Sequence, residues 1–208
     1  LSSEELPTEL PIIALRNIAI FPGTLAPILV GRKKSMEVIR QAEKENKCFG
    51  VVAQREAKVE DPTLQDLYPI GTIVEVTQII ELPTGELSAI LRGRQRFELK
   101  ELTQTDPYLM GRYTTLPEEE RGGASDKEYE ALVSLIHDRL IQLLEKLAPG
   151  APAGFMDTIK GIKNKAYIIN LASSVVDVPI ERRQEFLVAD TLNQRGVLVL
   201  SGLHGQIE

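Results

Sequence analysis

Residues 10–35 read LPIIALRNIAIFPGTLAPILVGRKKS, and this stretch decides the fold of the first half of the chain. Short apolar runs alternate with turn residues, which predicts three strands, at 10–14, 18–20 and 26–30. Pro22 and Gly23 separate the last two, because proline has no amide donor and glycine accepts turn dihedrals. We therefore expect a β-rich unit that begins here and continues into a basic helix at 33–46.

More strands follow the helix. A short apolar run predicts a buried strand at 48–53, and a polar loop spans 58–68. Residues 70–82 are rich in Ile, Val and Thr, and a turn at 83–86 returns the chain as a hairpin. We expect Gly93 to break the returning strand before further strands, which end at 108–116. Several short strands with one helix indicate a closed or nearly closed antiparallel barrel.

The second half has a different pattern. Residues 116–124 are polar and contain glycine, which is typical of a linker. Ser125 and Glu128 then form a capping-box pattern before apolar residues at three- and four-residue steps, which predict a helix to 147. Further helices are expected at 154–160, 165–174, 179–189 and from 191 onward. The last is expected to be weak, because each glycine in a helix costs about 1 kcal/mol against alanine.

Composition narrows the class of protein. The chain has 208 residues, 43% hydrophobic and 26% charged, as in an ordinary soluble globular protein. A net charge of −6 disfavours a nucleic acid as the main partner. The single cysteine, Cys48, favours a reducing compartment, and no apolar run approaches the ~18 residues of a membrane span. We expect a cytoplasmic protein, and the first residue, Leu1, suggests a piece of something longer.

No catalytic or metal-binding pattern is present. A phosphate loop needs a glycine before Lys-Ser, and Lys33 precedes Lys34 here. The two histidines lie far apart, so we expect neither a metal site nor a cofactor in this chain. One basic cluster contains Arg92, Arg94 and Arg96. A solvated strand face is its first interpretation and a partner contact the second, with an RNA-binding barrel as the corresponding alternative function.

Two features favour recognition of other proteins. The apolar loop at 21–25 is expected to leave Phe21 and Leu25 partly exposed beside Pro22, and aliphatic helices follow residue 125. Core packing is the alternative for both, because most apolar residues in such patterns are buried. Met110 and Tyr113, on the last predicted strand, complete the candidate substrate-binding residues; none is catalytic.

The ordered motifs of this chain resemble the amino-terminal domain of Lon-type ATP-dependent serine proteases over roughly residues 9–205. The resemblance is carried by Leu10-Pro11, Leu15-Arg16-Asn17, Phe21-Pro22, Gly31-Arg32, Gly71-Thr72, Leu82-Pro83, Gly85 and Gly93-x-x-Arg96. It implies an α+β fold, with a PUA-like β-rich pseudo-barrel followed by an all-α helical bundle. The corresponding domains are 1–117 and 126–208, joined by a linker at 118–125.

The same resemblance implies a function. The chain would be the substrate-recognition and assembly region of a homohexameric protease that degrades misfolded, damaged and short-lived proteins in stress response and quality control. Its partners would be unfolded polypeptides and other subunits, with no membrane. ATP, magnesium and the serine protease site would belong to the parent protein, so this chain should be inactive alone. Alternatives are a stand-alone peptide-binding adaptor, the RNA-binding barrel and a small hydrolase.

Overall fold

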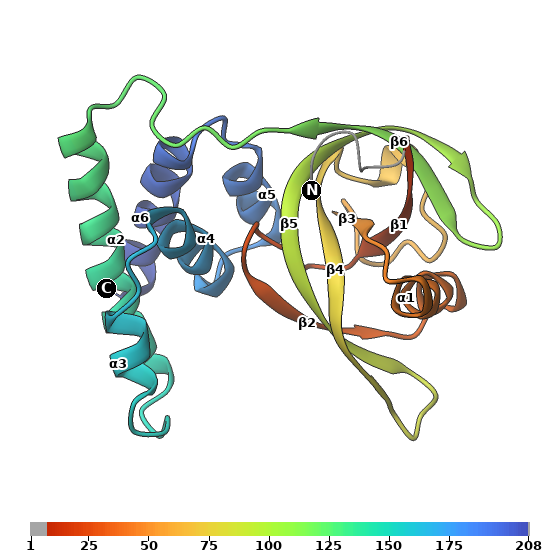
Figure 1. The fold of residues 1–208 in the computed structure, drawn as a ribbon, viewed down its shortest axis with the longest axis horizontal. Helices are drawn as coiled ribbons and strands as arrows, with labels where there is room; N and C mark the ends of the chain where they lie inside the picture. The colour runs from red at the N-terminus through yellow and green to blue at the C-terminus, as the bar shows by residue number, and fades with distance from the viewer. Residues whose placement is uncertain (1–7, 208) are drawn as a thin grey trace. The chain divides into compact units, whose positions relative to one another are not determined.

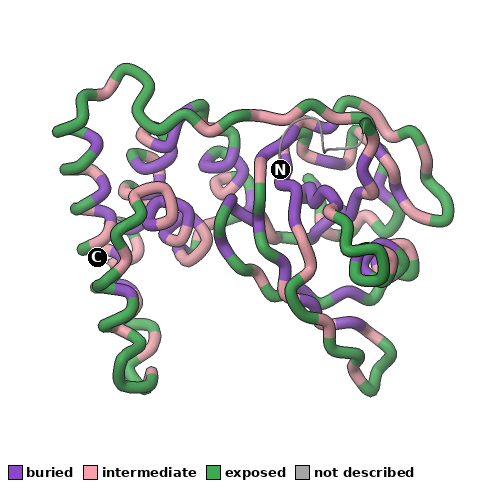
Figure 2. The backbone as a smooth tube through the Cα atoms, viewed as in Figure 1, coloured by how far each residue is buried: buried purple, intermediate pink, exposed green. Residues whose placement is uncertain are grey.

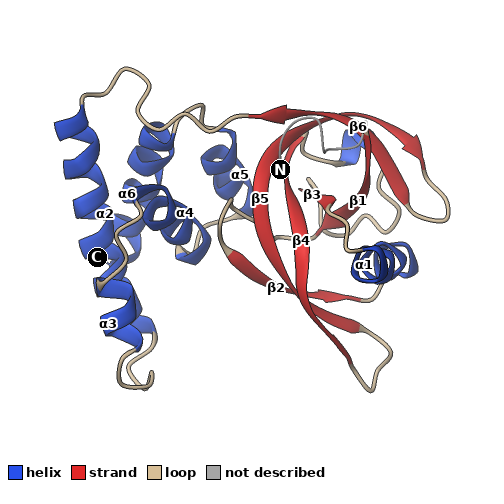
Figure 3. Ribbon diagram, in the orientation of Figure 1, coloured by secondary structure: helices blue, strands red, loops and turns tan. Residues whose placement is uncertain are grey.

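A computed structural model describes residues 8–207, and the chain forms two compact units (Figure 1). The first unit ends at Pro117 and the second begins at Glu118. The first contains all six strands and the second is helical (Figure 3). Each unit is built around its own buried residues (Figure 2).

The strands of the first unit form one six-stranded sheet in the order β2-β5-β4-β3-β1-β6. The strands are β1 Glu9–Leu15, β2 Leu25–Val30, β3 Phe49–Ala53, β4 Ile70–Glu81, β5 Leu87–Gln104 and β6 Leu109–Leu116. Helix α1, Lys33–Glu45, lies between β2 and β3, and a 3-10 turn, Leu64–Asp66, precedes β4. Because β6 also pairs with β5, the strands β5, β4, β3, β1 and β6 form a closed circuit of pairings.

The sheet is mixed, so the expectation of an antiparallel barrel is wrong for one pair. Strands β1 and β3 are parallel, with Ile13 opposite Val51, and the remaining pairs are antiparallel. Parallel neighbours need a crossover connection rather than a hairpin. Here β2 and α1 supply that crossover, because both lie between β1 and β3 along the chain.

Two groups of buried side chains form the core of this unit. One joins β1, β2 and α1 to the hairpin of β4 and β5; it includes Phe49 of β3, and the helix contributes Val38 and Ile39. The other contains Phe97 and Leu10. Both groups are aliphatic apart from these phenylalanines, as expected for a chain with 5% aromatic residues.

Two local predictions differ from the structure. Residues 18–20 form a loop rather than a strand, and the Ile20 carbonyl accepts a 2.6 Å hydrogen bond from Thr72 Oγ1. Gly93 does not break β5, which runs continuously from Leu87 to Gln104. Its amide donates to the Thr24 carbonyl and its carbonyl accepts from Gly23, at 2.9 Å each. Gly93 thus connects the 18–24 loop to the sheet.

The second unit contains five helices among the described residues. They are α2 Asp126–Leu147, α3 Phe155–Lys160, α4 Lys165–Val175, α5 Ile180–Val188 and α6 Leu192–Ile207. The Ser125 capping box is present, with reciprocal 3.2 Å bonds between Ser125 and Glu128. The last helix is continuous despite its glycines. A Cβ at Gly196 would lie 3.0 Å from Leu132 and from Ile136 of α2, so this glycine permits close helix packing.

Candidate functional site

The loop at 21–25, which was predicted to bind substrate, begins with two buried residues that form part of a β-turn. Phe21 is 0% exposed and Pro22 is also buried, so the expectation that Phe21 is partly exposed is wrong. Pro22 and Gly23 occupy the centre of a β-turn in which the Thr24 amide donates to the Phe21 carbonyl (3.2 Å). Gly23 has a φ of 79°, as the third residue of a type II turn requires. Phe21 therefore belongs to the core.

Leu25 is exposed, and it lies on an apolar surface that extends over three strands. The side chains of β2 alternate, so that Ile28 and Val30 are buried while Leu25 and Leu29 are 55% and 62% exposed. Leu29 pairs with Ser88 of β5, which pairs with Ile80 of β4, itself 50% exposed. We call this surface the outer apolar face; its members are Leu25, Pro27, Leu29, Ile80 and Ile90.

The other two predicted residues lie elsewhere in the sheet. Met110 and Tyr113 are half-buried on β6, which pairs with the carboxyl half of β5, whereas β2 pairs with its amino half. The Tyr113 ring packs edge-on against Phe97, with centroids 5.9 Å apart. Burial raises the pKa of the Tyr113 hydroxyl. The structure thus places these two residues apart from Leu25, at the margin of the core.

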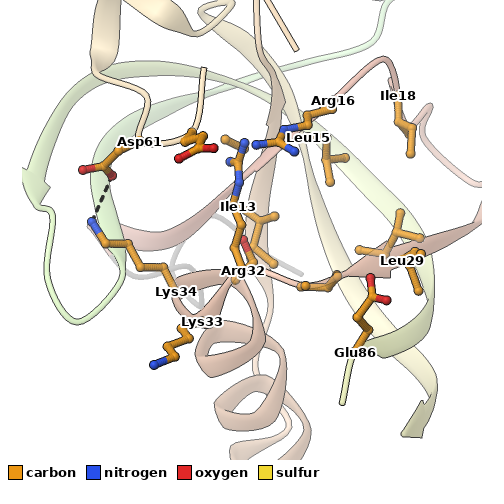
Figure 4. Close-up of a pocket in the computed structure, with 16 residues that line it drawn as sticks. Ile13, Leu15, Arg16, Ile18, Leu29, Arg32, Lys33, Lys34, Asp61 and Glu86 are labelled. Carbon is orange, nitrogen blue, oxygen red and sulfur yellow. Dashed lines mark hydrogen bonds and ion pairs between the residues drawn. The ribbon is translucent and has the colours of Figure 1, made fainter. Parts of the chain in front are cut away.

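A groove of about 690 Å³ lies between β2 and the carboxyl half of β1 (Figure 4). We call it the β1–β2 groove. Apolar residues of both strands line it, including Leu15 of β1, Leu29 of β2 and the half-buried Ile18 of the following loop. Charged residues surround them: Arg16, Arg32, Lys33, Lys34, Glu60, Asp61 and Glu86. The groove is therefore amphipathic, and its walls come largely from the 10–35 stretch.

The charges are unevenly distributed around the groove. Lys34 is paired with Asp61 at 3.2 Å, and Figure 4 shows Lys33 pointing away. Arg16 and Arg32 point toward each other. Burial lowers the pKa of the Arg32 guanidinium, and the positive charge of Arg16 lowers it further. Two like charges thus share one side of the groove, which favours a negatively charged group between them.

The predicted basic cluster on β5 is divided by the structure. Arg96 is buried and donates a 2.9 Å hydrogen bond to the Pro117 carbonyl. Arg94 pairs with Glu75 at 3.3 Å, and Arg92 is exposed. The interpretation of all three as one solvated face is therefore wrong for Arg96. Only one of the three remains exposed without an ion pair among the described residues, which argues against a phosphate-binding surface.

No sequence pattern indicates the polar cluster of the second unit. Arg195 is 1% exposed, and its Nε donates to the Phe186 carbonyl at 2.9 Å. Its Nη1 donates to Glu118 Oε1 and to Asn170 Oδ1. These partners come from three elements, so the guanidinium joins α4, α5 and α6 to the segment that precedes α2. This is a structural role, because the group is enclosed.

The sequence patterns do not predict the groove as a site. In the sequence, Arg16 and Arg32 belong to motifs and Leu29 to a predicted strand, and nothing indicates that the three lie together. The alternation of buried and exposed residues within 25–30, with Pro27 at its centre, is the signal that could have identified an exposed strand.

Among residues 8–207, no helix is long and apolar enough to cross a membrane, and no group of three or more metal-ligating side chains occurs.

Comparison with known proteins gives a consistent result. The family model of the ATP-dependent protease La (LON) substrate-binding domain matches residues 9–205. The chain is 40% identical to the Lon protease of Porphyromonas gingivalis over 205 residues, which is 99% of this chain and 24% of that protein. It is 39% identical to the Lon protease of Parabacteroides distasonis over 197 residues, covering 95% and 24%. The chain spans about a quarter of the length of these relatives.

Two solved structures share the fold. The N-terminal domain of Mycobacterium avium complex Lon protease superposes with a TM-score of 0.71 at 15% identity, covering 94% of this chain and 98% of that one. The Lon N-terminal domain protein from Xanthomonas campestris gives 0.63 at 18% identity, covering 94% and 98%. Together with the family match over almost the whole chain, these likenesses show that the chain belongs to the family of Lon substrate-binding domains.

Proposed function

We propose that this chain binds unfolded polypeptide as the substrate-recognition region of a Lon-type ATP-dependent serine protease. The observation that carries the proposal is the outer apolar face, on which Leu25, Leu29 and Ile80 are each half or more exposed. Exposed aliphatic side chains on neighbouring strands accept many apolar sequences without selecting one. Unfolded chains differ from folded ones in that they expose such sequences.

The remaining parts of the proposal rest on family membership. ATP and magnesium binding, proteolysis, a homohexamer and a role in cytoplasmic quality control would belong to the whole protease, in which this chain would bind without doing chemistry. Weak capture by each subunit would become effective through multivalency across a hexamer. The closed circuit of strands supports the description of the first unit as a PUA-like pseudo-barrel.

The proposed division places a linker at 118–125 between domains 1–117 and 126–208. The first residues of this segment contact the helical unit, because Leu192 and Asn193 donate to the carbonyls of Glu119 and Glu120 at 2.8 Å. The rest of the proposed linker contains a turn, in which the Ala124 amide donates to the Arg121 carbonyl at 3.1 Å.

The test is a fluorescence titration of this chain with labelled, reduced and carboxymethylated α-lactalbumin, which cannot fold, and with native α-lactalbumin as control. We expect dissociation constants in the micromolar range for the unfolded form and at least tenfold weaker binding of the native form, in keeping with weak transient contacts (about −8 kcal/mol at 1 μM). Equal binding of both forms, or none, would contradict the proposal.

Two variants assign the binding to the outer apolar face. Leu29→Ser and Ile80→Ser should each weaken binding by roughly three- to tenfold, because each removes about 1 kcal/mol of apolar contact. Leu147→Ser is the matched control, because Leu147 is equally exposed, at 55%, but lies at the end of α2. An equal effect of all three would argue against this face.

A further inference from the structure

Strand β2 has an unoccupied edge. Of the six strands in the described part of the chain, each pairs with two or three others except β2, which pairs with β5 alone. The opposite side of β2 faces the β1–β2 groove, which Ile28, Leu29 and Val30 line. An edge of this kind presents backbone N–H and C=O groups that have no partner in the sheet.

The register shows which backbone groups face the groove. Gly93 donates to the Thr24 carbonyl (2.9 Å), and hydrogen-bonded pairs alternate along an antiparallel ladder. Ala26, Ile28 and Val30 therefore exchange hydrogen bonds with β5, while the N–H and C=O groups of Leu25 and Leu29 point away from it. Pro27 lies between Leu25 and Leu29 and also faces away from β5, so its missing N–H costs no hydrogen bond to β5.

The opposite wall of the groove is also an incomplete strand edge. Strand β6 pairs with β1 only as far as Ile12, opposite Leu109. Beyond that point β1 pairs with β3 on one side, where the Leu15 carbonyl accepts from the Gln54 amide (2.8 Å). The backbone of Ala14 points the other way, toward the groove that Ala14 lines. The groove therefore lies between two strand edges, with a mostly apolar floor.

We propose that the β1–β2 groove binds an extended polypeptide segment as an added strand on the free edge of β2, with an acidic residue of that segment between Arg16 and Arg32. The inference rests on the proposed function and specifies its mode. Main-chain hydrogen bonds to Leu25 and Leu29 would supply affinity that is independent of sequence. Apolar residues at alternate positions would pack on Leu15, Ile18 and Leu29.

The acidic preference follows from the charges of the groove. Asp61 and Glu60 both act on the charge of Arg32, and Asp61 is also paired with Lys34. Arg16, Arg32 and Lys34 outnumber these two carboxylates in the lining of the groove, whereas Glu86 adds negative charge beside Gly31, where β2 ends. A segment with an acidic residue toward Arg16 complements this distribution.

The test is amide hydrogen exchange of the chain followed by NMR, with and without saturating carboxymethylated α-lactalbumin. Strand addition predicts a two-residue period: exchange at Leu25 and Leu29 slows by about tenfold or more, while Ala26 and Ile28, already bonded to β5, change little. Binding in the titration without this alternation would overturn the added strand and leave the proposed function intact. Absence of binding would overturn both.

A charge-reversal variant tests the preference for an acidic segment. Arg16→Glu should weaken binding of the same acidic probe by about fivefold or more, because Arg16 is exposed and its replacement reverses one of the paired charges. Lys127→Glu makes the same change of net charge on exposed α2 and should have little effect. Equal effects would overturn the acidic preference. Protection of Leu25 and Leu29 that depends on protein concentration without probe would assign the edge to a second copy of this chain.

Discussion

Gly93 and Phe21 approach so closely that a Cβ on Gly93 would lie 2.3 Å from the Phe21 carbonyl oxygen. The hydrogen bonds that Gly93 makes to Gly23 and Thr24 on the same strand edge require this approach. The turn that begins at Phe21 therefore requires that residue 93, on a strand far along the sequence, has no side chain. This contact also determines the register of β2, whose free edge borders the groove.

Gly93→Ala should destabilise the first unit by roughly 2–4 kcal/mol, because backbone atoms must move to admit the methyl group. Urea unfolding followed by circular dichroism measures the loss. Gly123→Ala is the control: no atom lies within 4 Å of its Cβ position, and its φ requires no glycine. Equal stability of the two variants would contradict the close approach.

Phe21→Ser should destabilise the first unit by roughly 3–5 kcal/mol, because it removes a fully buried ring from the core and leaves a cavity. Leu25→Ser should change stability by less than about 0.5 kcal/mol, because its side chain is mostly exposed. Thermal unfolding of both variants compares these expectations. A stable Phe21→Ser protein would argue that the ring is not part of the core.

Arg195→Ala should destabilise the helical unit by roughly 3–5 kcal/mol, since Glu118 and Asn170 lose a shared buried donor. Arg182→Ala removes an exposed pair with Glu185 and should cost less than about 1 kcal/mol. Chemical unfolding monitored by hydrogen exchange in α4 and α6 distinguishes the two. Similar small losses would show that the buried guanidinium contributes little net stability.

Tyr129 makes the stability of the helical unit depend on pH in the alkaline range. Burial raises the pKa of its hydroxyl to about 12, together with the negative charges of Glu120 and Glu118. The folded state thus holds this proton more tightly than the unfolded state, whose value is about 10. The resulting stabilisation is present below pH 10 and is lost as the pH rises from about 10 through 12.

Tyr129→Phe should remove this part of the pH dependence. The hydroxyl is buried and has no hydrogen-bond partner among the described residues, so the variant should be at least as stable as the parent at pH 7. Urea midpoints measured from pH 8 to pH 12 compare the two proteins. A parallel decline in both would assign the alkaline loss to other groups.

Local patterns predicted most elements of the fold. The capping box at Ser125 and the apolar repeat after it predict α2, and the apolar run after the Pro22-Gly23 turn predicts β2, because each of these signals lies within or beside the element that it predicts. The wrong predictions concern contacts between distant residues. Residues 18–20 are as apolar as a strand, yet they form a loop whose Ile20 carbonyl accepts a hydrogen bond from Thr72 of a distant strand. Gly93 continues its strand because a turn from elsewhere packs on it.

The candidate site could be predicted only in part, for the same reason. Leu25 is exposed as expected, but Phe21, four residues earlier, is buried, and its carbonyl lies against Gly93 of a distant strand. The β1–β2 groove depends on which strands pair, and the parallel β1–β3 pair was not predicted. Arg195 gives no sequence signal, because its partners lie on α4, on α5 and in the segment before α2, far apart along the chain.

The pairing of β1 with β6 has a consequence during synthesis on the ribosome. Glu9 lies opposite Arg112, so the first strand obtains its second neighbour only after almost the whole unit has been translated. At about 5–20 residues per second this takes roughly 5–20 s, during which the edge of β1 that will pair with β6 stays open. The nascent unit is therefore most prone to aggregate before β6 emerges, and closing the circuit ends that vulnerable period.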